Sequence, residues 1–183
     1  MTVDEVFKEV IKDKAFYENS GGGVTFSGGE CMLQIDFLHK ILKKCKEHCI
    51  HTAVDTCGFV LKKAFDKVIP YTDIFLYDIK AIDEDVHIKC TGQSNKIILE
   101  NLKYLDNRDC KIEIRIPYVP ECNSNQIEKI AEFLKPLKHI TKVKVLPYHN
   151  YAGSKYEALN MKNTLSEILP TEDEIKSAEQ LFL

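Results

Sequence analysis

The stretch Gly21-Gly22-Gly23-Val24-Thr25-Phe26-Ser27-Gly28-Gly29-Glu30 decides the fold. Five glycines flank a short run with strand character, and the stretch ends on an acid. Glycine at a strand end lets the backbone approach a ligand, because it lacks Cβ and tolerates positive φ. The pattern indicates a ligand cradle in which Glu30 faces a cation, a hydroxyl or an amine. A phosphate loop would have Lys and then Ser or Thr directly after the second glycine pair, where this chain has Glu30. A glycine-rich turn with a solvated glutamate is the alternative.

Four more motifs accompany predicted strands further along the chain. Each leaves polar residues near the carboxyl end of its strand, and helical patterns separate the strands. The strands are predicted at 50–54, 73–77, 111–114 and 142–145, and the motifs are Asp55-Thr56-Cys57-Gly58, Asp78-Ile79-Lys80, Arg115-Ile116-Pro117 and Leu146-Pro147-Tyr148-His149. An alternation of strands and helices predicts parallel strands.

Helical spacing of apolar residues predicts the intervening helices. The clearest runs from Leu33 to Cys49, with Cys45 and Cys49 on its apolar face, and another follows the turn at 122–124. Ser94 is a plausible N-cap for the helix that contains Ile98, Leu102 and Leu105. Capping-box spacing at Thr2/Glu5 and Thr171/Glu174 predicts helices that start near Val3 and Glu172.

Parallel strands joined by helices form either an open doubly wound sheet or a (β/α) barrel. In both folds, ligands bind at the carboxyl ends of the strands. The polar residues of the motifs therefore predict one shared site, formed by Glu30, Asp55, Asp78, Lys80, Arg115 and His149. The alternative is that these residues are ordinary polar residues of surface loops.

Composition narrows the function classes. The chain has 183 residues and a net charge of −3, with no basic stripe, which disfavours nucleic-acid binding. No apolar run is long enough to span a membrane, and the amino terminus lacks a signal-peptide core. We expect one domain over residues 1–183 and a cytoplasmic location.

The seven cysteines are the other notable feature of the composition. An odd number argues against a fully paired disulfide framework. Cys45 and Cys49 fit burial better than metal binding. Cys57 lies inside a site motif and Cys31 directly follows one, so we expect these two to contact a ligand without binding a metal. Cys90, Cys110 and Cys122 have no partner at zinc-finger spacing.

The motifs Gly-Gly-Gly-Val-Thr-Phe-Ser-Gly-Gly-Glu, Asp-Thr-Cys-Gly, Asp-Ile-Lys and Leu-Pro-Tyr-His follow one another in this order between residues 21 and 149. Together they resemble the radical S-adenosylmethionine (SAM) activating enzymes of glycyl radical enzymes, most closely the pyruvate formate-lyase activators. The resemblance implies a partial (β/α) TIM-like barrel with about five parallel strands of six. It also implies that the chain is truncated at its amino end, and at its carboxyl end as well.

The resemblance implies a role for each matched residue. Gly28, Gly29 and Glu30 would hold the SAM amino group, mainly through backbone carbonyls. Asp55, Thr56, Asp78 and the backbone of Leu76 match positions that bind a monovalent cation beside the SAM carboxylate. Three further residues match positions near the SAM carboxylate, the ribose and the cleaved bond: Lys80, Arg115 and His149.

The implied reaction is reductive cleavage of SAM by a [4Fe–4S] cluster. It yields a 5′-deoxyadenosyl radical that takes hydrogen from a glycine of a partner such as pyruvate formate-lyase, with flavodoxin or ferredoxin as electron donor. The family's Cys-x3-Cys-x2-Cys motif is absent: Cys45 and Cys49 have the first spacing, but Thr52 occupies the third place. We therefore expect this chain alone to bind no cluster and to leave SAM uncleaved.

Two other functions remain open from the sequence. One is a non-catalytic radical-SAM-like module that binds SAM or a partner protein. The other is an unrelated (β/α) protein that binds a metabolite. A cysteine motif encoded upstream of Met1 would favour the enzyme.

Overall fold

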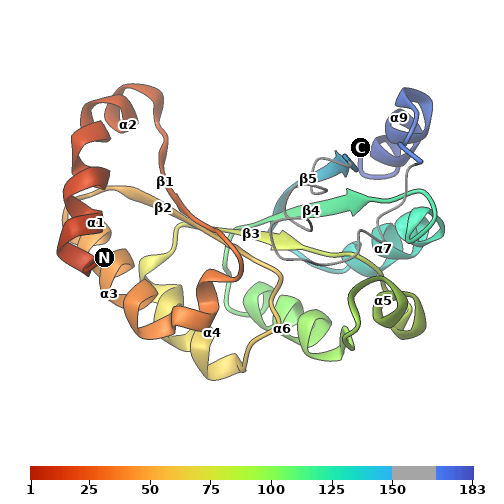
Figure 1. The fold of residues 1–183 in the computed structure, drawn as a ribbon, viewed down its shortest axis with the longest axis horizontal. Helices are drawn as coiled ribbons and strands as arrows, with labels where there is room; N and C mark the ends of the chain where they lie inside the picture. Colours follow the sequence, from red (N-terminus) through yellow and green to blue (C-terminus); the bar gives the residue numbers. More distant parts are fainter. Residues whose placement is uncertain (150–167) are drawn as a thin grey trace, which may run out of the picture. The chain divides into compact units, whose positions relative to one another are not determined.

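A computed structural model describes residues 1–149 and 168–183. Over these residues, five strands form one open sheet in the order β1-β2-β3-β4-β5 (Figure 1). The strands are β1 (Gly23–Phe26), β2 (His51–Thr56), β3 (Ile74–Asp78), β4 (Ile112–Tyr118) and β5 (Ile140–Pro147). They run parallel, and their order in the sheet follows the chain, as the sequence predicted.

Helices precede β1, connect successive strands and follow β5. They are α1 (Val3–Val10), α2 (Lys14–Ser20), α3 (Ile35–Glu47), α4 (Lys62–Val68), α5 (Glu84–Thr91), α6 (Lys96–Asp106), α7 (Ile127–Leu134) and α9 (Glu172–Gln180). Short 3₁₀ turns occur at Ile11–Asp13, Cys31–Gln34, Ile69–Tyr71 and Ser124–Gln126. Both predicted capping boxes are present, at Thr2 of α1 and Thr171 of α9.

The chain forms two compact units. The first comprises Met1–Asp78, Lys96–Ile114 and Leu137–Lys142. The second comprises Ile79–Asn95, Arg115–Pro136 and the described part of Val143–Leu183. The interpretation of residues 1–183 as one domain stays a prediction.

Alternating burial builds the core of the first unit. In β2, Thr52, Val54 and Thr56 are buried and alternate with residues that stay partly exposed. The apolar stripe of α3 is buried at Leu38, Ile41, Leu42 and Cys45. The rings of Phe65 and Phe75 meet edge to face, with their centroids 5.8 Å apart. The core of the second unit includes one face of α7, at Ile127, Ile130 and Leu134.

Helix α3 is shorter than the sequence predicted. Leu33 lies in the preceding 3₁₀ turn and is 74% exposed, so it is not part of the apolar face. Cys49 lies beyond the helix and is exposed, so the prediction that it is buried is wrong. The reason is the turn into β2: Cys49 takes a left-handed φ of 56°, and Ile50 donates its N–H to the Cys45 carbonyl and is buried instead.

The prediction that Ser94 caps the next helix stays a prediction. Helix α6 begins at Lys96. The Ser94 hydroxyl donates to the Glu84 carboxylate at 2.7 Å, and the Asn95 side chain donates to the backbone carbonyls of Ala81 and Ile82.

Candidate functional site

The Gly28-Gly29 loop at the end of β1 presents bare backbone. Gly28 has a φ of 89° and Gly29 a φ of 52°, a region that favours glycine. No atom lies within 4 Å of the point that a Cβ would occupy on either residue. Both residues are exposed, so an incoming ligand could approach the peptide groups of this loop.

The Glu30 carboxylate accepts three hydrogen bonds from residues of the first unit. One oxygen accepts from the Thr56 hydroxyl at 2.8 Å and from Met32 N–H at 3.1 Å. The other accepts from Cys57 N–H at 2.9 Å. Glu30 thus joins the glycine loop to the turn after β2, and its backbone carbonyl accepts from Leu33 N–H at 3.1 Å.

The carboxyl ends of β2 and β3 bring oxygen-bearing residues together. Asp55 pairs in register with Leu76, and Asp78 lies two residues beyond Leu76 on the same face of β3. The Ser27 hydroxyl donates to Asp55 at 2.7 Å. Asp55, Leu76 and Asp78 therefore share one face at this end of the sheet. The buried Thr56 side chain lies on the other face of β2, where its hydroxyl bonds to Glu30 and Gly58 N–H.

The sequence analysis gave no role to Asn101 or Tyr77, and both hold the turn after β2. The buried Asn101 of α6 donates to the carbonyls of Gly58 at 2.9 Å and Val60 at 2.8 Å. Gly58, with a φ of 74°, lies so close to the buried Tyr77 that a Cβ would be 1.7 Å from its hydroxyl. The available signal was the position of Asn101, a polar residue on the same helical stripe as Ile98, Leu102 and Leu105.

The Cys31 thiol is held in its protonated form. It donates to the carbonyls of Asp55 at 3.3 Å and Phe26 at 3.4 Å. Burial, followed by the charges of Glu30 and Asp55, raises the pKa of Cys31 to about 12. Burial also raises the pKa of Cys45 and of Cys110 to about 11. These thiols are poor sources of thiolate at neutral pH.

The remaining predicted site residues belong to the second unit. Lys80 follows β3 by two residues, and its carbonyl accepts from Asn123. Arg115 lies in the middle of β4, because that strand continues to Tyr118 rather than ending near Ile114 as predicted. It shares the half-buried face of β4 with Glu113 and Pro117. His149 follows β5 by two residues and is exposed.

Over residues 1–149 and 168–183, no three His, Cys, Asp or Glu side chains are gathered as metal ligands. None of the helices in the described residues is long and apolar enough to cross a membrane.

Residues 1–134 match the family model described as the radical SAM superfamily. The chain belongs to the radical SAM superfamily. It is 44% identical to the trans-4-hydroxy-L-proline dehydratase activating enzyme of Clostridioides difficile, over 99% of this chain and 62% of the relative. It is 37% identical to the pyruvate formate-lyase-activating enzyme of Clostridium pasteurianum, over 100% of this chain and 77% of the relative. The resemblance to activators of glycyl radical enzymes is confirmed.

Solved structures agree with the family assignment. A domain of the pyruvate formate-lyase-activating enzyme from Bacteroides vulgatus superposes with a TM-score of 0.72 at 34% identity, over 87% of this chain and 92% of that chain. Streptococcus suis SuiB bound to S-adenosylmethionine superposes with a TM-score of 0.62 at 22% identity, over 71% of this chain and 30% of SuiB, and shows the fold alone. The predicted partial barrel of the radical SAM type is confirmed, and the interpretation as an unrelated (β/α) protein is wrong.

Proposed function

We propose that this chain is the SAM-binding core of an enzyme that activates a glycyl radical enzyme. The observation that carries the proposal is the exposed Gly28-Gly29 backbone beside the oxygen group of Asp55, Leu76 and Asp78. The named relatives support it, because they are activating enzymes of three different partners: trans-4-hydroxy-L-proline dehydratase, pyruvate formate-lyase and choline trimethylamine-lyase.

The glycine loop fits the methionyl end of SAM. An ammonium group needs acceptors, and a backbone without side chains offers carbonyl oxygens at close range. Because the Glu30 carboxylate accepts bonds from Thr56, Cys57 and Met32, and its carbonyl accepts from Leu33 N–H, we assign ammonium binding to the carbonyls of Gly28 and Gly29. Lys80, Arg115 and His149 would supply donors for the SAM carboxylate and ribose.

The oxygen group at the ends of β2 and β3 fits a monovalent cation. Asp55 and Asp78 supply charge and the Leu76 carbonyl supplies a neutral oxygen, and hard cations prefer such oxygen ligands. A cation held there would face the SAM carboxylate and offset its charge.

When a [4Fe–4S] cluster is bound, it supplies the electron that starts the radical chemistry of the family. The chain's own residues would bind and orient SAM for that step. The proposal includes a partner such as pyruvate formate-lyase and an electron donor such as flavodoxin or ferredoxin. It also places the protein in the cytoplasm.

The test uses the full-length protein, reconstituted anaerobically with iron and sulfide. SAM binding is measured by calorimetry with and without potassium. Asp55→Asn and Asp78→Asn should each weaken binding about tenfold or more and reduce its potassium dependence. Asp85→Asn, at an exposed position of α5, is the matched control and should bind like the unsubstituted protein. Unchanged affinity in both site variants would contradict the proposed site.

The activity is tested separately by electron paramagnetic resonance. The reduced protein is mixed with SAM and with each of the three partner enzymes in turn, and a glycyl radical is expected on one of them. Binding of SAM without a radical on any partner would instead favour a non-catalytic module. The 183-residue chain by itself should hold no stable cluster after the same reconstitution.

A further inference from the structure

Three buried amide side chains hold the loop that follows β3. Asn123 donates to the Lys80 carbonyl at 2.7 Å, and Asn95 donates to the carbonyls of Ala81 at 2.9 Å and Ile82 at 2.7 Å. The Gln126 amide oxygen accepts from Ile82 N–H at 3.2 Å and Asp83 N–H at 3.0 Å. We call Asn95, Asn123 and Gln126 the amide cluster.

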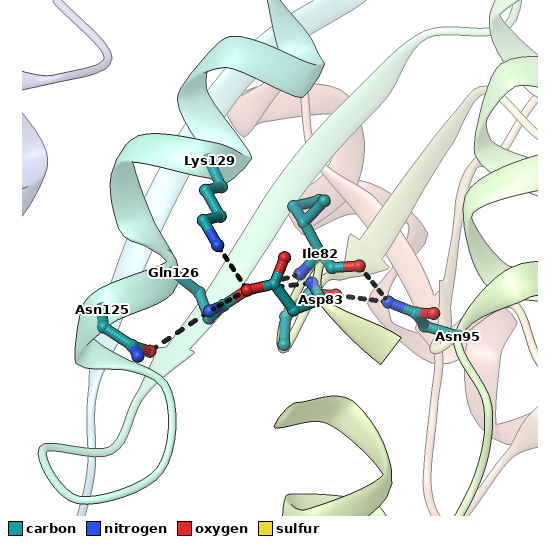
Figure 2. Close-up of polar contacts among 7 residues, drawn as sticks. Ile82, Asp83, Asn95, Asn125, Gln126 and Lys129 are labelled. Atoms are coloured by element: carbon teal, nitrogen blue, oxygen red, sulfur yellow. Dashed lines mark hydrogen bonds and ion pairs between the residues drawn. The ribbon is translucent and has the colours of Figure 1, made fainter. Parts of the chain in front are cut away.

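The cluster reaches the loop from separate parts of the second unit. Figure 2 shows Gln126 and Lys129 directed at Asp83 from one side and Asn95 bonded to the loop from the other. Every residue from Lys80 to Asp83 has at least one backbone group bonded to the cluster. The backbone of this short loop is therefore held in one shape.

Each amide is deeply buried and well satisfied. Asn95 is 2%, Asn123 3% and Gln126 0% exposed. Asn123 also donates to the Pro117 carbonyl at 2.6 Å and accepts from Val119 N–H at 2.8 Å, which attaches the loop to the end of β4. A buried polar network whose bonds are all made adds modest net stability, but it specifies a unique geometry.

We propose that the amide cluster positions Lys80 for SAM by fixing the backbone of residues 80–83. The proposal rests on the proposed function, in which the Lys80 side chain acts on SAM. Asn123 has the most direct role, because its amide is bonded to the Lys80 peptide itself. The cluster would act through Lys80 without touching SAM, so its members are positioning residues.

The test is a double-mutant cycle in the full-length, reconstituted protein, with SAM affinity measured by calorimetry. Lys80→Met should weaken SAM binding about tenfold, because it removes a charged donor. Asn123→Leu should weaken it roughly fivefold to tenfold. If Asn123 acts through Lys80, the double variant should bind no more weakly than Lys80→Met alone.

Hydrogen exchange supplies a readout that does not depend on SAM. In Gln126→Met, which keeps the side-chain volume, the amides of Ile82 and Asp83 should exchange at least about tenfold faster. Thr52→Val is the matched control: the buried Thr52 donates to the Tyr71 carbonyl at 2.7 Å in the first unit. It should lower the melting temperature and leave SAM affinity and exchange at Ile82 unchanged.

The outcomes separate the two proposals. If the unsubstituted protein binds no SAM, the proposed function fails and the positioning role fails with it. If SAM binds and the losses from Asn123→Leu and Lys80→Met multiply, or if Asn123→Leu has no effect, the positioning role is overturned while the proposed function stands. Unchanged exchange at Ile82 and Asp83 in Gln126→Met would also overturn the positioning role and leave the proposed function standing.

Discussion

The loops that follow β2 and β3 are held by different means. After β2, the turn at Thr56–Val60 is held by a carboxylate, by Asn101 and by the close approach of Gly58 to Tyr77. After β3, residues 80–83 are held by neutral amides, with an ion pair only at the exposed end. The difference shows two kinds of sensitivity to substitution. The steric contact at Gly58 should make the first loop intolerant of one added methyl group, whereas each amide of the second loop can be removed separately with a smaller loss.

The largest effect on stability is expected from a substitution that disrupts the close contact between Gly58 and Tyr77. Gly58→Ala should lower the free energy of unfolding by about 3 kcal/mol or more, because its Cβ would overlap Tyr77 and its φ is left-handed. Gly92→Ala is the control, with a φ of 77° and no atom within 4 Å of the added Cβ. It should cost about 1 kcal/mol. Equal losses in urea unfolding would show that the contact with Tyr77 is unimportant.

Removing the Glu30 charge should have the next largest effect. Glu30→Gln places an amide nitrogen where the carboxylate now accepts bonds, so Cys57 N–H or the Thr56 hydroxyl loses its acceptor. The loss should be about 1 to 3 kcal/mol in chemical denaturation. Glu128→Gln is the control, on the surface of α7. A Glu30→Gln variant as stable as this control would mean that the carboxylate does not hold the turn.

A pH titration tests the contact of Cys31, in the turn after β1, with the Asp55 carbonyl near the end of β2. The folded pKa of Cys31, about 12, lies above the usual thiol value, so the unfolded chain loses this proton first as the pH rises. The stabilising contribution is therefore present below about pH 9 and is lost as the pH rises toward 12. In Cys31→Ala, stability should decline less steeply over this range than in the unsubstituted protein. Parallel declines would contradict the assignment.

The smallest effect concerns the exposed end of the second loop. Lys129 pairs with Asp83 and is the main cause of the lowered pKa of that carboxyl, but both side chains are about half exposed. Lys129→Met should shift the melting temperature by no more than about 2 °C. Exchange at Ile82 should also stay as it is. Faster exchange at Ile82 in Lys129→Met would mean that the ion pair, rather than the amide cluster, holds the backbone of this loop.

Sequence patterns predicted the elements better than their ends. The strands and the capping boxes at Thr2 and Thr171 follow from local patterns, because side-chain alternation and capping are local effects. The end of α3 did not follow, because Cys49 has to turn the chain into β2. The extension of β4 past Arg115 to Tyr118 was missed as well, because the length of a strand depends on its pairing with neighbouring strands.

By itself, the sequence determined the parallel strand order, the family and the motif residues near the strand ends, because these depend on the order and spacing of residues along the chain. The tertiary structure decided that Glu30 holds Thr56 and Cys57, that Gly58 lies against Tyr77, and that Asn123 bonds to Lys80. The last pair lies 43 positions apart. A hydrogen bond depends on separations of a few ångströms in space, and only the folded chain fixes those separations.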